Sequence, residues 1–142
     1  MKHYDIIFLS LAQNCSNHLS KFFSTLDELN KTKSVYSMIG ENGSNDFTLD
    51  KILKYSYTNN NLEFVDTTFI ESSHNRVERL GMARQKLKDL MIKQNLKSSY
   101  VCVVDLDDVL NINFNSETIL NSIKKLEDNK NKYFAISSKS KP

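Results

Sequence analysis

Two kinds of hydrophobic pattern alternate along the chain, one typical of strands and one typical of helices. Short apolar runs predict strands over residues 4–12, 35–39, 62–65 and 100–104, and a fifth strand over 133–136. Between these runs, apolar residues recur every three or four positions, which predicts helices over about 17–31, around 49–53, over about 74–94, and from residue 116 onward. Turn-forming residues 40–46 separate the second strand from the second helix, where Asn45 or Asp46 is a suitable cap.

Strands that alternate with amphipathic helices at this spacing indicate right-handed β-α-β crossovers. We therefore expect an α/β fold, a three-layer Rossmann-like sandwich with a mostly parallel sheet. With 142 residues, the chain is long enough to bury one core, and we place a single domain at residues 4–137.

The apolar run 100–104 leads directly into three carboxylates, Asp105, Asp107 and Asp108. An unbroken valine-rich run is typical of a parallel strand covered on both faces, and ligands of such sheets bind beyond the carboxyl ends of the strands. Carboxylates that gather at one point repel each other unless a divalent cation such as Mg²⁺ or Mn²⁺ holds them, and such a cation attracts phosphate. Acidic residues after a strand are also common in turns and helix caps, so the pattern alone leaves both interpretations open.

The long helix over 74–94 carries arginines beside its expected buried stripe. A rotation of about 100° per residue places Arg76 inside the stripe and Arg79 and Arg84 at its margins. The residues of the stripe are Leu80, Ala83, Leu87, Leu90 and Met91. Because a guanidinium group stays charged, its burial calls for an anionic partner, and the first half of this helix lies at the same sheet edge as the acids. The arginines therefore fit a diphosphate with its cation, or alternatively pair with the acids or extend into water.

Composition narrows the class of protein. The net charge is +2, from 19 basic and 17 acidic residues that are intermixed, which gives no reason to expect nucleic acid as a partner. Two cysteines, Cys15 and Cys102, indicate reduced thiols and a cytoplasmic location. The apolar stretch at residues 6–9 is too short to span a membrane.

Three segments together resemble the signature of a group of GT-A-type glycosyltransferases. Residues 41–48 read Glu-Asn-Gly-Ser-Asn-Asp-Phe-Thr, residues 76–85 read Arg-Val-Glu-Arg-Leu-Gly-Met-Ala-Arg-Gln, and residues 105–107 form an Asp-x-Asp motif. The end of the first strand at Gln13 and Asn14 also matches in place, so the resemblance covers about residues 4–112. Gln85 stands where the family usually has Asn, and Asn42 where many relatives have an acid.

The resemblance implies the N-terminal, nucleotide-sugar-binding half of a GT-A fold, acting on a nucleotide-diphosphate sugar donor and an unknown acceptor, whether glycan, lipid or protein. It assigns Asp105 and Asp107 to the ribose and to a bridging Mn²⁺ or Mg²⁺, with Asp108 assisting. It assigns the donor nucleotide to residues at the strand ends and on the long helix, namely Gln13, Asn14, Glu41, Asn42, Arg79 and Arg84. GT-A enzymes continue into a second half that supplies acceptor contacts and often the base, so we expect a fragment or split half and assign no catalytic base.

Two other functions remain open at this stage. Residues 104–110 also resemble the first motif of haloacid-dehalogenase-like phosphatases, with Asp105 as nucleophile, Asp107 as acid and base, and residues 134–138 as a second motif. In that family the nucleophile strand usually opens the domain, whereas here other strands precede it. The third possibility is a non-catalytic nucleotide-sugar-binding module on the same half-fold.

Overall fold

The computed structural model of the protein describes residues 2–108 and 114–137. Its strands form one parallel sheet in the order β3-β2-β1-β4, with β1 at Lys2–Ala12, β2 at Val35–Glu41, β3 at Leu62–Asp66 and β4 at Leu96–Asp105. The α-helices are α1 (Ser16–Leu29), α2 (Thr48–Thr58), α3 (Arg76–Lys93) and α4 (Ser116–Asp128). Two short 3-10 helices follow β3 and β4, η1 at Thr68–Ser72 and η2 at Leu106–Asp108. In the described parts of the chain, no helix combines the length and apolar character that crossing a membrane requires.

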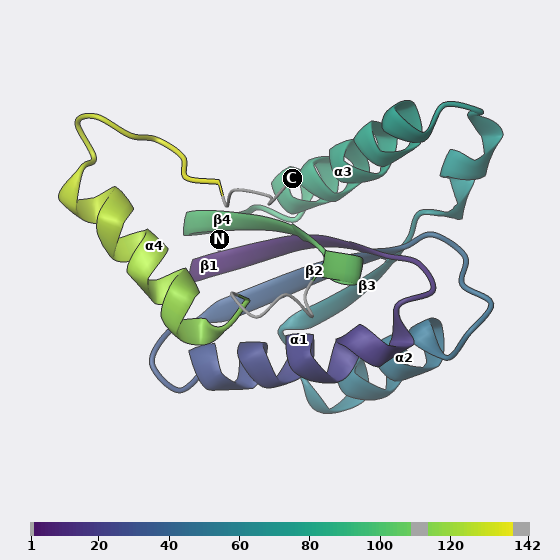
Figure 1. Ribbon diagram of the computed structural model, residues 1–142, viewed down its shortest axis with the longest axis horizontal. Coiled ribbons are helices and arrows are strands. Elements are labelled where there is room, and N and C mark those ends of the chain that lie inside the picture. The colour runs from purple at the N-terminus through teal and green to yellow at the C-terminus, as the bar shows by residue number, and fades with distance from the viewer. Residues whose placement is uncertain (1, 109–113, 138–142) are drawn as a thin grey trace.

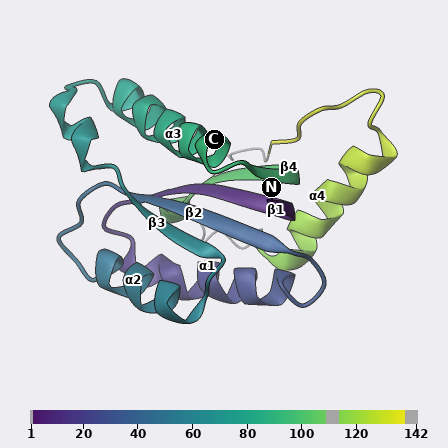
Figure 2. The same ribbon diagram turned by 180° about the vertical axis from the view of Figure 1, so that it is seen from behind.

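The helices cover the two faces of the sheet in separate layers (Figures 1 and 2). Helix α3 lies on one face, and α1, α2 and α4 lie on the other. Side chains of the central strand β1 alternate between these layers, since Ile6 and Phe8 pack with α1 whereas Ile7 and Leu9 pack with α3. The predicted α/β three-layer sandwich is confirmed, with every strand pair in the sheet parallel.

Strand β2 is longer than the sequence predicts. It continues through Gly40 to Glu41 instead of ending at Ile39, because these residues pair with Leu11 and Ala12 of β1. The sequence pattern predicts a turn at Gly40, but the residue lies in the strand, where the absence of a side chain leaves room for Leu11: a Cβ at Gly40 would lie 2.9 Å from Leu11 Cδ2.

The prediction of a strand over residues 133–136 is wrong. These residues form no regular structure, and the side chain of Phe134 is fully exposed. A strand requires a hydrogen-bonded neighbour, and none of the described strands pairs with this segment, so its apolar composition alone does not fix it. The second motif of the phosphatase interpretation, residues 134–138, thus forms no strand at 134–137, and Ser138 lies outside the described residues.

The apolar run of β4 predicts a strand that is covered on both faces. The structure shows that one face is covered less than the other. Val101 and Val103 are 48% and 59% exposed, whereas Tyr100, Cys102 and Val104 pack against the layer that contains α1 and α4. Val101 and Val103 are exposed because β4 is the outer strand of the sheet, next to β1. The described residues of the α3 layer leave these two side chains partly uncovered.

We predict opposite effects from adding the same methyl group at two glycines. Gly40→Ala should destabilise the fold by about 1–3 kcal/mol, because the new Cβ meets the buried Leu11 and Thr67 side chains at 2.9 and 3.0 Å. Gly81→Ala, in the middle of α3 with nothing within 4 Å of its Cβ, should stabilise it by about 0.5–1 kcal/mol. Urea denaturation measures both changes, and a Gly40→Ala protein as stable as wild type would contradict the close approach.

Candidate functional site

A cavity of about 330 Å³ opens at the carboxyl edge of the sheet. The end of every strand, or the segment that follows it, contributes to its wall, as expected for ligand sites in open α/β sheets. The lining residues are Leu11, Gln13, Asn42, Ile70, Glu71, Arg76, Arg79, Leu80, Asp105 and Asp107. The structure thus brings two acids at and just after the end of β4, Asp105 and Asp107, and two arginines of α3, Arg76 and Arg79, to one cavity, which we call the strand-end cavity.

The two acids of this cavity have different surroundings. Asp105 ends β4, and its Oδ2 lies 2.8 Å from Nη2 of Arg84 on α3, with the two side chains 29% and 43% exposed. This pair fixes the Asp105 carboxylate, and Arg84 does not itself line the cavity. Asp107 is exposed and has no hydrogen bond or ion pair with any described residue. The side chain of Asp108, the third predicted ligand, lies outside the described residues.

Arg76 and Arg79 line the cavity, and neither forms an ion pair within the described chain. Arg76 is exposed, although the helical rotation placed it inside the buried stripe. It is the first residue of α3, and the packing of this helix on the sheet begins one turn later, at Leu80. The prediction that Arg76 lies within the buried stripe is wrong, because this residue precedes the part of α3 that covers the core.

Of the four predicted polar residues at the ends of β1 and β2, two line the cavity and two do not. Gln13 lines it and donates from Nε2 to the Gly43 carbonyl at 3.5 Å. Asn42 also lines it, and its Oδ1 accepts a hydrogen bond from the Thr67 hydroxyl. Glu41 is buried, and both of its carboxylate oxygens are used within the next loop, by the Gly43 N–H at 3.1 Å and the Ser44 hydroxyl at 2.5 Å.

Asn14 connects the loops that follow β1 and β2. Its backbone is left-handed, with φ of 50°, a conformation that Asn adopts more readily than most residues. Its N–H donates to Ser44 Oγ at 2.9 Å, and its Oδ1 accepts from the Asn45 N–H at 2.8 Å. Asn14 therefore ties together the two loops whose residues Gln13 and Asn42 line the cavity.

The sequence patterns did not identify the contribution of η1. Ile70 and Glu71 line the cavity from this short helix, which follows β3 at the same edge. Lys86 of α3 holds the segment by donating to the Asp66 carbonyl at 2.8 Å, with Nζ 5.0 Å above the Phe69 ring. The only available signal was position, because any segment that follows a parallel strand lies at this edge.

The titratable groups limit the chemistry of the site. Burial raises the pKa of the Cys15 thiol to about 11, with the charges of Asp46 and Asp107 adding to the effect, so the thiol is protonated at neutral pH and is no nucleophile. Within the described residues, no three His, Cys, Asp or Glu side chains gather as a closed metal site. A pair of carboxylates nevertheless suits Mg²⁺, which commonly takes one or two carboxylates and completes its shell with phosphate and water. Asp105 and Asp107 fit that kind of open site.

We predict that the loop between β2 and α2 loosens in acid. Hydrogen bonds from the Thr48 hydroxyl and the Thr48 and Ser16 N–H groups lower the pKa of Asp46 from 3.8 to about 2. Because the folded pKa is the lower one, the ionised carboxylate stabilises the fold above about pH 4, and this contribution is lost as the pH falls toward 2. Thermal unfolding followed by circular dichroism should show a weaker pH dependence in Asp46→Asn over that window. An unchanged dependence would contradict these contacts.

Two solved structures similar to this chain are both of S. aureus TarS. One matches 87% of this chain with a TM-score of 0.53 and 16% identity, and the other, of TarS 1–349, matches 89% with a TM-score of 0.54 and 15% identity. This chain spans only 20% and 33% of those two chains. No protein-family model and no curated protein sequence matches it. At this level of identity the likeness establishes the fold alone, which is a Rossmann-like α/β sandwich with a parallel sheet.

Proposed function

We propose that this chain is the nucleotide-sugar-binding part of a metal-dependent glycosyltransferase, which transfers a glycosyl group from a nucleotide-diphosphate sugar to an acceptor. The observation that carries the proposal is the strand-end cavity, which Arg76 and Arg79 of α3 line together with Asp105 and Asp107. The similarity of the fold to that of TarS, which is a glycosyltransferase, supports glycosyl transfer as the class of reaction.

In this proposal the arginines bind the diphosphate of the donor. A guanidinium group presents paired N–H donors that match two phosphate oxygens, and these charge-assisted bonds are stronger than neutral ones. Arg76 and Arg79 have no carboxylate partner in the described chain, so their donors are free for a ligand. Gln13 and Asn42, which line the same cavity with amide groups, would contact the nucleoside.

Asp105 and Asp107 would hold the divalent cation, Mn²⁺ or Mg²⁺, together with the phosphates, and Asp108 remains a proposed third ligand. When bound, the cation supplies Lewis-acid stabilisation of the diphosphate leaving group. Arg84 is a positioning residue here, because its ion pair keeps the Asp105 carboxylate at the end of β4. The acceptor, whether glycan, lipid or protein, is not assigned, and neither is a catalytic base.

We predict that binding of UDP or GDP to this chain depends on Mn²⁺ and on Asp107. Isothermal titration calorimetry should show that Asp107→Asn weakens Mn²⁺-dependent binding by at least about tenfold, or about 1.4 kcal/mol. Asp128→Asn, at the exposed end of α4, makes the same chemical change away from the cavity and should bind as wild type does. Equal affinities for wild type and Asp107→Asn would sink the assignment of the metal site.

We predict a different effect at Arg79. Arg79→Gln should weaken nucleotide diphosphate binding by roughly tenfold or more, because it removes a charge-assisted hydrogen bond to phosphate, while the response to Mn²⁺ persists. Calorimetry with and without Mn²⁺ separates the two contributions. An Arg79→Gln protein that binds UDP and GDP normally would exclude this arginine from the donor site.

Binding without glycosyl transfer or donor hydrolysis would identify a binding module instead of an enzyme.

A further inference from the structure

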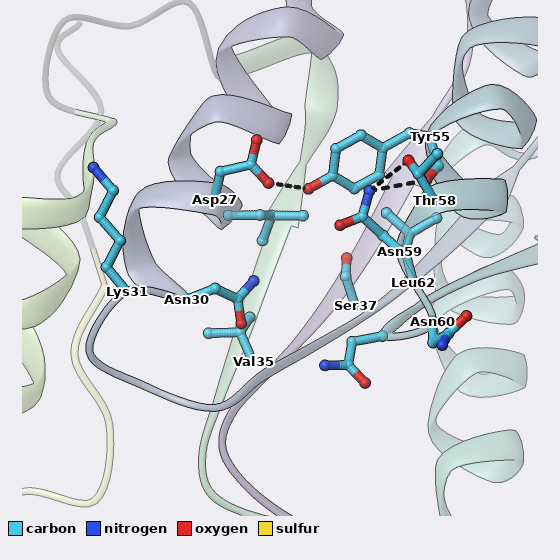
Figure 3. Close-up of a pocket in the computed structure, with 12 residues that line it drawn as sticks. Asp27, Asn30, Lys31, Val35, Ser37, Tyr55, Thr58, Asn59, Asn60 and Leu62 are labelled. Atoms are coloured by element: carbon cyan, nitrogen blue, oxygen red, sulfur yellow. Dashed lines mark hydrogen bonds between the residues drawn. The ribbon is translucent and has the colours of Figure 1, made fainter.

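A second cavity, of about 500 Å³, lies at the opposite edge of the sheet (Figure 3). It is formed where α1 and α2 end and where β2 and β3 begin. It is larger than the strand-end cavity and shares no lining residue with it. No residue of this second cavity has a place in the donor site, so what it binds is a separate question.

One buried hydroxyl group in the second cavity lacks a partner. Ser37 of β2 lines the cavity and is 1% exposed, and its Oγ has no hydrogen bond to any described residue. Leaving a buried hydroxyl group unpaired is costly, and native proteins rarely do so without a reason. The Ser37 Oγ is closed to solvent, so a ligand hydroxyl would supply the missing hydrogen bond after a small shift of the side chains that cover it.

The charges of this cavity disfavour an anion. Its ionisable side chains with a formal charge at neutral pH are Asp27 and Lys31, of opposite sign, and Lys31 is already paired with Glu28 at 2.9 Å. The carboxyl ends of α1 and α2 add negative partial charge, because the last carbonyl groups of a helix have no intrahelical donor. A phosphate-bearing ligand therefore belongs in the strand-end cavity, and a neutral hydrogen-bond donor in the second one.

Amide groups surround the opening. The side chains of Asn30, Asn60 and Asn61 form no hydrogen bond within the described chain, so both donors and acceptors are free. Figure 3 shows Asn30, Ser37 and Asn59 around one space, with the Tyr55 hydroxyl donating to Asp27 Oδ1 at 2.5 Å beside it. Apolar side chains, Leu26, Val35 and Leu62, complete the lining.

We propose that the second cavity binds a neutral carbohydrate. Amides and hydroxyls that both donate and accept match sugar hydroxyl groups, and apolar side chains match the C–H face of a sugar ring. A volume of about 500 Å³ is within the usual range for small-ligand sites and exceeds the needs of a single sugar ring. The inference does not depend on the donor site, because the two cavities have no residue in common.

Nuclear magnetic resonance titration of the whole ¹⁵N-labelled chain tests the proposal. The probes are the methyl glycosides of glucose, galactose, mannose and N-acetylglucosamine, with UDP as a charged comparison. At least one glycoside should shift the amide signals of Asn30, Ser37 and Asn59 in a saturable way and leave those of Asp105 and Asp107 unchanged. If no glycoside shifts these signals, or if UDP shifts them instead, the proposal is wrong.

Two variants test whether the cavity itself is the binding site. Ser37→Ala and Asn30→Ala should each weaken glycoside binding about threefold to tenfold, the effect of one lost hydrogen bond. Ser37→Ala should melt at the same temperature as wild type or higher, because it removes a buried unpaired hydroxyl group, and Asn30 is exposed, so its replacement preserves the fold. Asn121→Ala on the exposed surface of α4 is the matched control and should bind normally. Unchanged binding in both cavity variants would overturn the proposal even if a glycoside binds.

Discussion

The parallel register of β1 with its two neighbours is the constraint on which the site depends. Ala12 pairs with Glu41 of β2, and Leu11 pairs with Asp105 of β4, so these strands end at nearly the same level. Glu41 in turn pairs with Asp66 at the end of β3. The segments that follow the strands therefore meet at one edge, although up to 94 residues separate them along the chain. A slip of one residue would turn every side chain of the shifted strand to the opposite face, and the wall of the strand-end cavity would lose its contributions from that strand.

Polar residues at this edge divide into those that line the cavity and those that support the lining. Gln13 and Asn42 lie at the cavity, while Asn14 connects the loops after β1 and β2, and Glu41 holds the loop that follows β2. Asp105 and Asp107 both line the cavity and differ in their partners, because an ion pair with Arg84 holds Asp105 in place and Asp107 has no described partner. Since loops carry few apolar contacts, such hydrogen bonds are the means by which polar loops acquire a defined shape.

The hydrophobic pattern was sufficient to predict the layers but not how far each element is covered. It located all the strands of the sheet, because each pairs along a run of apolar residues, and it located the buried stripe of α3, where Ala83 and Leu87 are fully buried. It failed where a neighbour decides the outcome: the apolar segment around Phe134 has no strand beside it, and Val103 lies on the outer strand of the sheet. The placement of acids and arginines at one edge followed from topology. The contribution of η1 to the lining of the cavity could not be predicted, because nothing in the composition of residues 68–72 distinguishes a cavity wall from an ordinary loop.

The charges around the strand-end cavity explain why a diphosphate and a divalent cation would bind there together. Counting Arg84 with the lining residues, the described groups are three guanidinium groups and three carboxylates, which cancel. They are Arg76, Arg79, Arg84, Glu71, Asp105 and Asp107. A diphosphate alone would be attracted by the arginines and repelled by the carboxylates. A cation alone would be attracted by the carboxylates and repelled by the arginines. A diphosphate with its cation adds little net charge while giving each set of side chains its partner, so the binding of either should strengthen the binding of the other. The second cavity has two helix carboxyl ends and no unpaired cation among its described lining residues, so it offers no such balance. This difference in charge would direct the two proposed ligand classes to opposite edges of one sheet.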